Sequence, residues 1–455
     1  MANSIQSSND RILVIGLGLT GYSVVKHLVK SGMQVTVADS RELPPYLQQV
    51  KDEFPNLEII TGRIPYAWFG RFDQIVTSPG VEIERQNFSS GGALIGDIEL
   101  FVKQAEAPII AITGSNGKST VTMLVAEMML AAGLKVKTGG NIGTPVLDLL
   151  DQALPDYYVP DYYVLELSSF QLETTYSLNA CSATVLNISA DHMDRYSSLD
   201  DYTMAKKRIF ENANKVVVNR DDALTNPRPY QNTAQNTSII SFGLDAPQAA
   251  NQFGVAESGN SRSLVHGETL LARVEQITLQ GEQNIANILA AMALVETAGV
   301  RLSPVVINAA LNYGGLPHRC EIVAEVNGVK WINDSKGTNA GATIAAITGF
   351  SQNLILIAGG KGKGADFSQL AEVVKERVQH TILFGEDAGI IFESLDQSVP
   401  STRVDLLEQA VVYARKLAQP GSVVLFSPAC ASFDMFDNYE HRGNVYKQLV
   451  WDLVH

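Results

Sequence analysis

The sequence has few cysteines and no long apolar run, and each shortage excludes a class of protein. Its three cysteines, Cys181, Cys320 and Cys430, are far apart and odd in number, which fits neither a disulfide framework nor zinc-ligand spacing. The apolar run at residues 121–134 is interrupted by Glu127, so we expect no membrane span. The first ten residues carry neither a basic nor an apolar segment, so we expect no secretory leader.

Basic residues are also scarce, and the formal net charge is −14. This balance argues against nucleic acid as a partner. It still permits an anionic small substrate, because screening confines the general field to about 8 Å at physiological salt and local cations decide binding. We therefore predict a cytoplasmic protein that binds neither nucleic acid nor membrane.

The length of 455 residues suggests about three domains of roughly 150 residues each. We predict an α/β protein with a Rossmann-like N-terminal domain, a P-loop central domain and a C-terminal Rossmann-like open sheet. The boundaries that we place are 1–96, 97–315 and 316–455.

Strands and turns along the chain carry this prediction. A strand at 11–15, a glycine turn, a helix ending near Gly32 and a strand at 33–40 form a β-α-β unit. Asn327-Gly328 between alternating strands predicts a hairpin, because a type I′ turn needs positive φ at both positions. Residues 220–282 are polar and irregular, which indicates either a small β excursion or long loops.

The stretch "IIAITGSNGKST" carries the most specific signal. Gly114 and Gly117 allow the backbone to wrap an oxyanion, Lys118 supplies a cation, and Ser119 supplies a hydroxyl for Mg²⁺ at a helix N-terminus. Ile112 stands where the strict pattern has its first glycine. The alternative is an accidental glycine turn, but the strand before it and the helix after it favour nucleotide binding.

A second glycine loop, "VIGLGLTG", comes earlier in the chain. Gly16, Gly18 and Gly21 have the spacing of a dinucleotide-binding turn, and Asp39 ends the next strand, where an acid meets a ribose hydroxyl. No hydride-transfer constellation accompanies it, so a pocket for another nucleotide explains it equally well. Two such loops in one chain suggest ATP at the later one and a nucleotide-tagged substrate at the earlier one.

Hard metal ligands follow two further strands. Glu166 ends an apolar strand, where a carboxylate is costly unless a cation meets it, and His192 stands beside Asp191 and Asp194. After a phosphate loop, these residues favour Mg²⁺ coordination over a structural role. Lys206 could equally be a solvated helix lysine.

Two polar loops near the carboxyl end follow strands and could each be a simple turn. They contain Asp334, Lys336, Thr338 and Asn339 in one loop and Lys361 and Lys363 in the other. Cys430 has no identifiable histidine partner, so we interpret it as structural.

The strings "AITGSNGKST", "GGNIG", "LELSSFQLE", "DHMDRY", "LPHR", "NDSKGTN" and "SPACASFD", in this order, resemble the Mur ligases. The resemblance spans residues 11 to about 450, with a weak stretch at 221–275, and it is strongest to the members that add D-glutamate. It implies three domains and an ATP-dependent amide-bond-forming enzyme, a monomer acting on UDP-N-acetylmuramoyl-L-alanine and D-glutamate.

The resemblance also implies site residues. The UDP-substrate would contact Gly18, Leu19, Thr20, Asp39, Ser40, Arg41, Ser78, Pro79, Gly80, Asn141 and His192. ATP would contact Gly114, Ser115, Asn116, Gly117, Lys118, Ser119, Thr120, Asn284, Asn287, Arg319 and Asp334. D-Glutamate would contact His318, Lys336, Thr338, Lys363, Ser432, Phe433 and Tyr439. Two Mg²⁺ ions would be held by Ser119, Glu166, His192 and a carbamylated Lys206. Catalysis would rest on Lys118, Asn141, Glu166, His192 and Lys206.

The expected chemistry is ATP-driven activation of a carboxylate as an acyl phosphate, followed by attack of an amine. The residues do not identify the base that takes the proton of that amine. Three alternatives stay open: a ligase for another amino acid or a folate, an NAD-dependent oxidoreductase, and a regulatory nucleotide-binding module without turnover.

Overall fold

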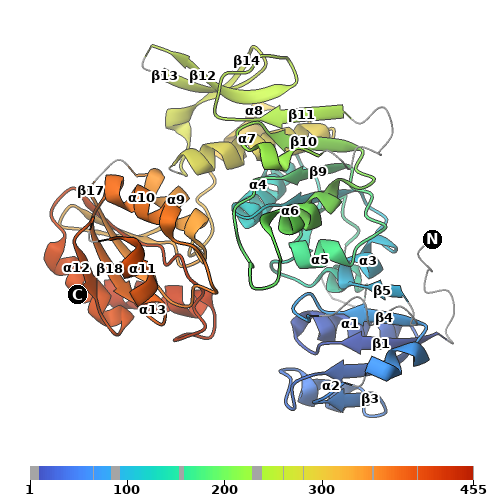
Figure 1. The fold of residues 1–455 in the computed structure, drawn as a ribbon. Coiled ribbons are helices and arrows are strands. Elements are labelled where there is room, and N and C mark those ends of the chain that lie inside the picture. Colours follow the sequence, from blue (N-terminus) through green and yellow to red (C-terminus); the bar gives the residue numbers. More distant parts are fainter. Residues whose placement is uncertain are drawn as a thin grey trace.

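The computed structural model describes residues 10–64, 66–82, 93–152, 158–227, 238–259, 261–279, 281–350, 353–396 and 398–453. Three β-sheets follow one another along the chain, each flanked by helices, and they form three lobes (Figure 1). We call them the N-terminal, middle and C-terminal lobes. This arrangement confirms the predicted three-part α/β fold, while the boundaries after residues 96 and 315 stay predictions.

The N-terminal lobe is a parallel sheet of order β3-β2-β1-β4-β5. Its strands are β1 (Arg11–Ile15), β2 (Gln34–Asp39), β3 (Glu58–Thr61), β4 (Gln74–Thr77) and β5 (Ala93–Ile95), and its helices are α1 (Leu19–Lys30), α2 (Leu47–Glu53) and η1 (Tyr66–Arg71). Strand order reverses at β1, between β2 and β4. Ligands bind in such sheets where loops diverge at the reversal, beyond the carboxyl ends of the strands.

The middle lobe has the largest sheet, of order β14-β13-β12-β11-β10-β9-β6-β8-β7. Its strands are β6 (Ile109–Thr113), β7 (Val136–Gly140), β8 (Tyr162–Glu166), β9 (Ser182–Val185), β10 (Lys215–Asn219), β11 (Ser238–Phe242), β12 (Gln252–Ser258), β13 (Ser261–His266) and β14 (Thr269–Arg273). The pairs from β7 to β12 are parallel, and β12, β13 and β14 pair antiparallel. The described residues of the polar stretch after residue 220 thus include four strands, β11 to β14, that extend the sheet.

Helices cover both faces of the middle sheet. They are α3 (Asp97–Val102), α4 (Lys118–Ala131), η3 (Val146–Leu150), α5 (Ser169–Glu173), α6 (Leu199–Lys207), η4 (Arg208–Phe210), η5 (Ala223–Thr225), η6 (Val274–Gln276), α7 (Glu282–Thr297) and α8 (Pro304–Leu311). α7 is buried along almost its whole length, and its apolar residues share one core with α4 and α8. A helix that is apolar on every side is stable only inside a protein. By packing against α4, α7 holds in place the helix that starts at the phosphate loop.

The C-terminal lobe is a sheet of order β15-β16-β20-β17-β18-β19, antiparallel only between β15 and β16. Its elements are β15 (Glu321–Val326), β16 (Val329–Asn333), α9 (Ala340–Thr348), β17 (Asn353–Gly359), α10 (Ser368–Arg377), β18 (Val378–Phe384), α11 (Ala388–Ser394), β19 (Ser401–Arg403), α12 (Leu407–Leu417), β20 (Ser422–Phe426) and α13 (Tyr439–Asp452). Asn327 and Gly328 have φ of 52° and 74°, which confirms the predicted hairpin turn. Among the described residues, no helix is long and apolar enough to cross a membrane.

Candidate active site

The phosphate loop connects β6 to α4 at the carboxyl edge of the middle sheet, where β6 lies between β9 and β8. Gly114 and Gly117 have φ of 156° and 80°, values that favour glycine. A Cβ on Gly117 would lie 2.5 Å from Oδ1 of Asn287 on α7. Glycine therefore lets the loop approach α7 closely, as the sequence pattern requires.

Lys118 begins α4 and folds back over the loop. Its Nζ donates to the carbonyl oxygens of Gly114 at 2.8 Å and Ser115 at 2.9 Å. Burial lowers the pKa of Lys118, although the carboxylates of Glu166 and Asp191 oppose that change. The partial positive charge of the helix N-terminus adds to the lysine charge, so this end of α4 suits a phosphate group.

Ser119 and Glu166 form the centre of the predicted metal site. Ser119 Oγ donates to Glu166 Oε2 at 2.6 Å, and Asn141 Nδ2 donates to Glu166 Oε1 at 2.8 Å. Arg319 reaches across from the C-terminal lobe, and its Nη2 donates to Ser119 Oγ at 2.5 Å. Glu166 is 1% exposed, so these contacts offset the cost of burying its charge.

Lys206 on α6 points at the same loop, where its Nζ donates to Gly114 O at 2.9 Å. Burial, followed by the charge of Lys118, lowers the pKa of Lys206 well below its usual value. Lys207, the next residue, faces the charges of Asp222 and Asp200 instead. The structure thus brings Lys206, rather than Lys207, to the phosphate loop.

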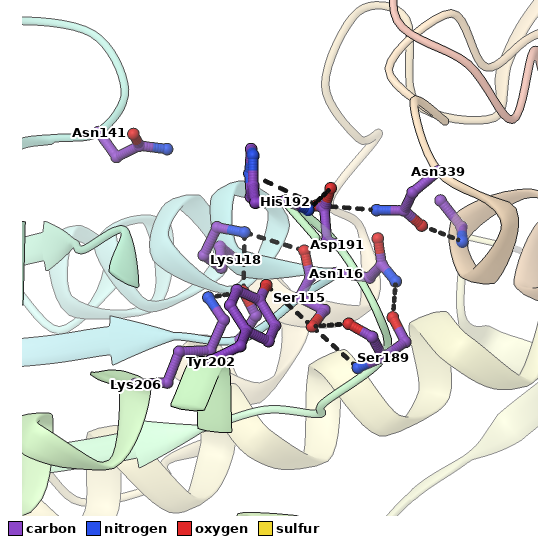
Figure 2. A network of polar contacts seen from close by, with 12 residues as sticks. Ser115, Asn116, Lys118, Asn141, Ser189, Asp191, His192, Tyr202, Lys206 and Asn339 are labelled. Atoms are coloured by element: carbon purple, nitrogen blue, oxygen red, sulfur yellow. Dashed lines mark hydrogen bonds and ion pairs between the residues drawn. The ribbon is translucent and has the colours of Figure 1, made fainter. Parts of the chain in front are cut away.

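Ser115 and Tyr202 hold the loop from the other side (Figure 2). Ser115 Oγ is 3.1 Å from the Tyr202 hydroxyl, donates to Ser189 O at 2.9 Å and accepts from Ser189 N at 2.9 Å. Lys206 Nζ lies 4.7 Å from the centre of the Tyr202 ring. In this structure the Ser115 hydroxyl therefore anchors the loop to the segment after β9.

His192 lies beside Asp191, with Nε2 3.7 Å from Asp191 Oδ2. Burial lowers the pKa of His192, with Lys363, Lys206 and Lys118 acting in the same direction and Asp191 against it. The neutral ring that results is the form that binds metals.

Asp191 also connects two lobes. Its Oδ2 accepts from Nδ2 of Asn339 at 3.1 Å, and Asn339 is the N-cap of α9 in the C-terminal lobe (Figure 2). The segment after β9 therefore contacts both the phosphate loop and the C-terminal lobe.

A cavity of about 350 Å³ opens beside the phosphate loop. It gathers most of the residues predicted to bind ATP from the middle and C-terminal lobes. These are Asn116, Gly117, Thr120, Asn284, Asn287, Arg319 and Asp334. Burial raises the pKa of Asp334 to about 6, although hydrogen bonds from Ser427 and Cys320 oppose this change.

A larger cavity of about 1480 Å³ extends from the glycine loop of the N-terminal lobe toward the middle lobe. It brings together the residues predicted for the UDP-substrate, except His192. These are Gly18, Leu19, Thr20, Asp39, Ser40, Arg41, Ser78, Pro79, Gly80 and Asn141. Ser78 Oγ donates to Gly16 O at 3.0 Å, which ties the loops after β4 and β1 together.

Asp39, the predicted ribose ligand, is engaged by the protein itself. Its carboxylate accepts from Leu17 N at 2.6 Å and from the backbone and guanidinium of Arg41 at 2.6–2.9 Å. Burial would raise the pKa of Asp39, but these hydrogen bonds hold it below its usual value. The carboxylate thus shapes the glycine loop as well as lining the cavity.

The residues predicted for D-glutamate are only partly brought together. Lys336 and Tyr439 line the large cavity, with Lys336 Nζ 3.8 Å from the centre of the Tyr439 ring. Thr338, Lys363, Ser432 and Phe433 line neither of the two cavities, and Phe433 is 65% exposed.

His318 is placed differently from the other predicted D-glutamate residues. It is 6% exposed, and its Nδ1 is 2.9 Å from Asn333 Nδ2. A Cβ on Gly443 would lie 2.2 Å from the same nitrogen. In this structure, His318 therefore packs inside the C-terminal lobe.

The sequence interpretation missed several residues at these cavities. Gln171 lines the large cavity, and Asn187 orients the phosphate loop by accepting from Asn116 N at 2.8 Å. Asn187 follows a buried strand, the position that singled out Glu166, so the same signal could have found it. Arg63 also lines the large cavity, and nothing in its surrounding sequence marks it.

Three family descriptions match consecutive parts of the chain. The Mur ligase MurD-like N-terminal domain matches residues 10–93, the Mur ligase middle domain matches 112–295, and the Mur ligase glutamate ligase domain matches 318–430. The chain belongs to the Mur ligase family, which consists of ATP-dependent ligases that form amide bonds.

Individual relatives narrow this class. A protein from Legionella pneumophila (strain Paris) is 46% identical over 96% of this chain and 98% of its own length. One from Pseudomonas putida is 46% identical over the full length of both chains. Both are named UDP-N-acetylmuramoylalanine--D-glutamate ligase. The structure of MurF ligase from Thermotoga maritima in complex with ADP shares the fold, with a TM-score of 0.60, 15% identity and coverage of 100% of this chain and 98% of that one.

Proposed function

We propose that the chain is an ATP-dependent ligase that joins D-glutamate to UDP-N-acetylmuramoyl-L-alanine, in the synthesis of peptidoglycan precursors. The relatives described above carry this name at 46% identity over nearly their full length. The observation that carries the proposal for the site itself is that Lys336 lines both cavities. One side chain thus borders the predicted nucleotide-substrate site and the predicted ATP site.

The chemistry explains why the two sites must meet. A carboxylate resists attack by an amine because its carbonyl carbon is electron-rich and oxide is a poor leaving group. In the proposed reaction, an oxygen of the L-alanyl carboxylate attacks the γ-phosphorus of ATP, which releases ADP and leaves an acyl phosphate. The D-glutamate amine then attacks the carbonyl carbon, and orthophosphate leaves from the tetrahedral intermediate.

Charge cancellation is the main demand of the first step, because it joins two anions. Lys118 and the N-terminus of α4 supply positive charge at the predicted position of the phosphates. Arg319 adds positive charge at the smaller cavity, and Lys336, which lines both cavities, extends it to the large one. Positioning of the reactants contributes as well, with about 7–11 kcal/mol in well-oriented systems.

The donors present fit a Mg²⁺ ion at Ser119 and Glu166. A hydroxyl and a buried carboxylate whose oxygens are 2.6 Å apart are the hard oxygen ligands that this ion takes. When bound there, Mg²⁺ would neutralise developing charge on the phosphoryl oxygens. Within the described parts of the chain, no cluster of three or more His, Cys, Asp or Glu side chains is placed to hold a metal.

A second Mg²⁺ requires a further oxygen ligand, and we propose a carbamate on Lys206 for this role, with His192 nearby. Burial lowers the pKa of Lys206 well below its usual value, which favours the neutral amine that reacts with CO₂. The carbamate would replace a cation by an oxygen ligand. Lys206→Ala should lose activity, and an added short-chain carboxylic acid should partly restore it. An unmodified Lys206 in the electron density of a crystal structure, with no such rescue, would remove this part of the proposal.

Phosphate release measured with single substrates omitted tests the reaction. Release should require ATP, UDP-N-acetylmuramoyl-L-alanine and D-glutamate together, and ¹⁸O placed in the L-alanyl carboxylate should appear in the orthophosphate. A preference for another amino acid or for a folate would indicate another ligase of the superfamily. A change in nicotinamide absorbance without phosphate release, or ATP binding without turnover, would overturn the ligase assignment.

We also propose that the enzyme acts as a monomer in the cytoplasm. The residues predicted for all three substrates come from one chain, so no second copy is needed to complete a site. Cys181, Cys320 and Cys430 are unpaired, as expected where thiols stay reduced.

A further inference from the structure

Arg442 on α13 is a fully buried cation outside the two cavities. It is 0% exposed, and each arm of its guanidinium donates to a loop. Nε donates to Ser335 Oγ at 3.1 Å, Nη2 to Ser335 O at 2.8 Å and Nη1 to Cys430 O at 3.0 Å. Ser335 Oγ in turn donates to Tyr439 O at 2.9 Å, at the start of the same helix.

No carboxylate of the described residues forms an ion pair with this guanidinium. Burial lowers the pKa of Arg442 to about 10, while the more distant charges of Asp434 and Asp334 oppose the change. A buried charge without an ionic partner destabilises a fold relative to an apolar side chain of similar size. Stability alone therefore does not account for an arginine at this position.

The two loops that Arg442 contacts leave neighbouring strands. Ser335 follows β16 and Cys430 follows β20, and these strands pair in parallel. Their loops diverge at the carboxyl edge of the sheet, which is the ligand-binding edge of this fold class. A guanidinium has five donors in a rigid planar fork, so it can fix the separation of two loops more firmly than a lysine ammonium, which has three donors on a flexible stem.

A third loop joins this arrangement. Gly360, after β17, has φ of 129°, and a Cβ there would lie 2.3 Å from Ala431 O and 3.2 Å from Arg442 Nη1. Lys361 and Ala431 exchange two backbone hydrogen bonds of 2.9 Å. Backbone hydrogen bonds thus fix the loop after β20 to the loop after β17, and Arg442 fixes it to the loop after β16.

We propose that Arg442 is a positioning residue for the amino-acid substrate. It holds the loop that carries Lys336 and Thr338 at a fixed distance from the loop that carries Ser432 and Phe433. The proposal rests on the proposed function, because these four residues are among the seven predicted to hold D-glutamate. Arg442 itself contacts neither the substrate nor the reacting atoms.

The test compares Arg442→Met and Arg442→Lys with Asn444→Ala, an exposed position on the same helix. In Arg442→Met the KM for D-glutamate should rise roughly tenfold or more, as expected for the loss of hydrogen bonds from a charged group. The KM values for ATP and the nucleotide-linked substrate should stay within about twofold of wild type. Arg442→Lys should restore part of the D-glutamate affinity, and Asn444→Ala should behave like wild type.

The first chemical step separates a loss of D-glutamate binding from a loss of folding. Misfolded protein would form less acyl phosphate, whereas a protein that only binds D-glutamate poorly would form it normally. Formation of the acyl phosphate without D-glutamate, trapped by borohydride reduction of the UDP-linked product, should remain at the wild-type level in Arg442→Met. Equal rises in all three KM values, or a fall in this first step, would overturn the proposal. So would an unchanged KM for D-glutamate.

A second variant decides the matter if Arg442→Met fails to fold. Ser335→Ala removes the hydroxyl that connects Arg442 to Tyr439 but leaves the Ser335 carbonyl contact in place. It should raise the KM for D-glutamate alone, by a smaller factor, and an equal change in all substrates would reject the positioning role. Failure of the proposed function is a separate result, since wild-type protein would then release no phosphate in response to D-glutamate.

Discussion

The two glycine loops of this chain have the same local architecture and different surroundings. Each connects a buried strand to a helix at the carboxyl edge of a parallel sheet, and each contains a glycine with positive φ, Gly16 and Gly114. The helix after the first loop begins with Leu19, whereas the helix after the second begins with Lys118. The second loop therefore has a positive charge at the helix start that the first loop lacks at the same position.

The charges around the loops extend this difference. At the first loop, the buried carboxylate of Asp39 is paired with Arg41, whose side chain is 52% exposed. At the second, three buried or largely buried lysines, Lys118, Lys206 and Lys336, have lowered pKa values. Nearby carboxylates, among them Glu166, oppose these shifts only in part, and a bound polyanion would favour the charged forms of Lys118 and Lys336. This difference fits the proposal that ATP reacts at the second loop and that the first loop binds the UDP-linked substrate.

The largest expected effect comes from removing the cation of the second loop. Lys118→Ala should lower kcat by about 10³-fold or more, since electrostatic groups aimed at developing charge contribute on that scale. The matched change at the first loop, Arg41→Ala, should raise the KM for the UDP-linked substrate and leave kcat within about threefold. Steady-state kinetics with each substrate varied in turn measure both.

Lys375→Ala, at an exposed position of α10, is the control for the loss of a lysine. Equal falls of kcat in Lys118→Ala and Arg41→Ala would remove the proposed division of labour between the loops.

The next effect concerns the geometry of the first loop. A Cβ on Gly21 would lie 1.8 Å from the carbonyl oxygen of Gly16, whereas a Cβ on Gly18 would meet no atom within 4 Å. Gly21→Ala should therefore destabilise the protein by about 1–3 kcal/mol or more, as overpacked sites do. Gly18→Ala should fold normally and weaken only the binding of the UDP-linked substrate, because its methyl group would point into the large cavity.

Chemical denaturation followed by tryptophan fluorescence compares the two variants. Equal stability of Gly21→Ala and wild type would show that the loop can move to accept the methyl group.

The sequence was sufficient to predict the features of the fold that depend on a few adjacent residues. The phosphate loop, the glycine stops and the Asn327–Gly328 hairpin follow from backbone preferences of a few adjacent residues, and the ligand edge follows from parallel strand order. The same patterns placed Glu166 at the end of its strand. These features needed no knowledge of distant contacts.

What depends on distant contacts could not be predicted from local pattern. Arg319 contacts Ser119 across 200 positions of the chain, and Arg442 contacts Ser335 across 107 positions. Thr338, Lys363, Ser432 and Phe433 could be proposed only by resemblance, and they line neither cavity here. His318 is a polar residue in a motif, yet its packing against Gly443 is set by tertiary structure.

The dependence of affinity on pH should differ between the surroundings of the two glycine loops, to which Lys336 and Asp39 contribute. Burial lowers the pKa of Lys336 to about 8, so its amine is a cation below that pH and becomes neutral above it. The KM for D-glutamate should therefore rise above pH 8, by up to about tenfold per pH unit where the cation is required. The KM for the UDP-linked substrate should stay flat in this range, because the pKa of Asp39 lies below its usual value.

Lys336→Arg gives the control for this prediction, because arginine stays charged throughout. Its KM for D-glutamate should no longer increase between pH 8 and about pH 10. Parallel increases for wild type and variant would assign the pH dependence to another group, such as the amine of the substrate.

The smallest expected effect tests whether the second loop depends on the C-terminal lobe. Asn339 accepts from Ala342 N at 2.8 Å as the N-cap of α9, and it donates to Asp191 in the middle lobe. Asn339→Ala removes both contacts and should lower stability by about 1 kcal/mol, the usual cost of a lost N-cap. Asn339→Asp keeps the cap but places a carboxylate next to that of Asp191. If Asn339→Asp keeps the stability of wild type but raises the KM for ATP, the contact between the lobes supports the phosphate loop. If the KM for ATP is unchanged in both variants, Asn339 only stabilises α9.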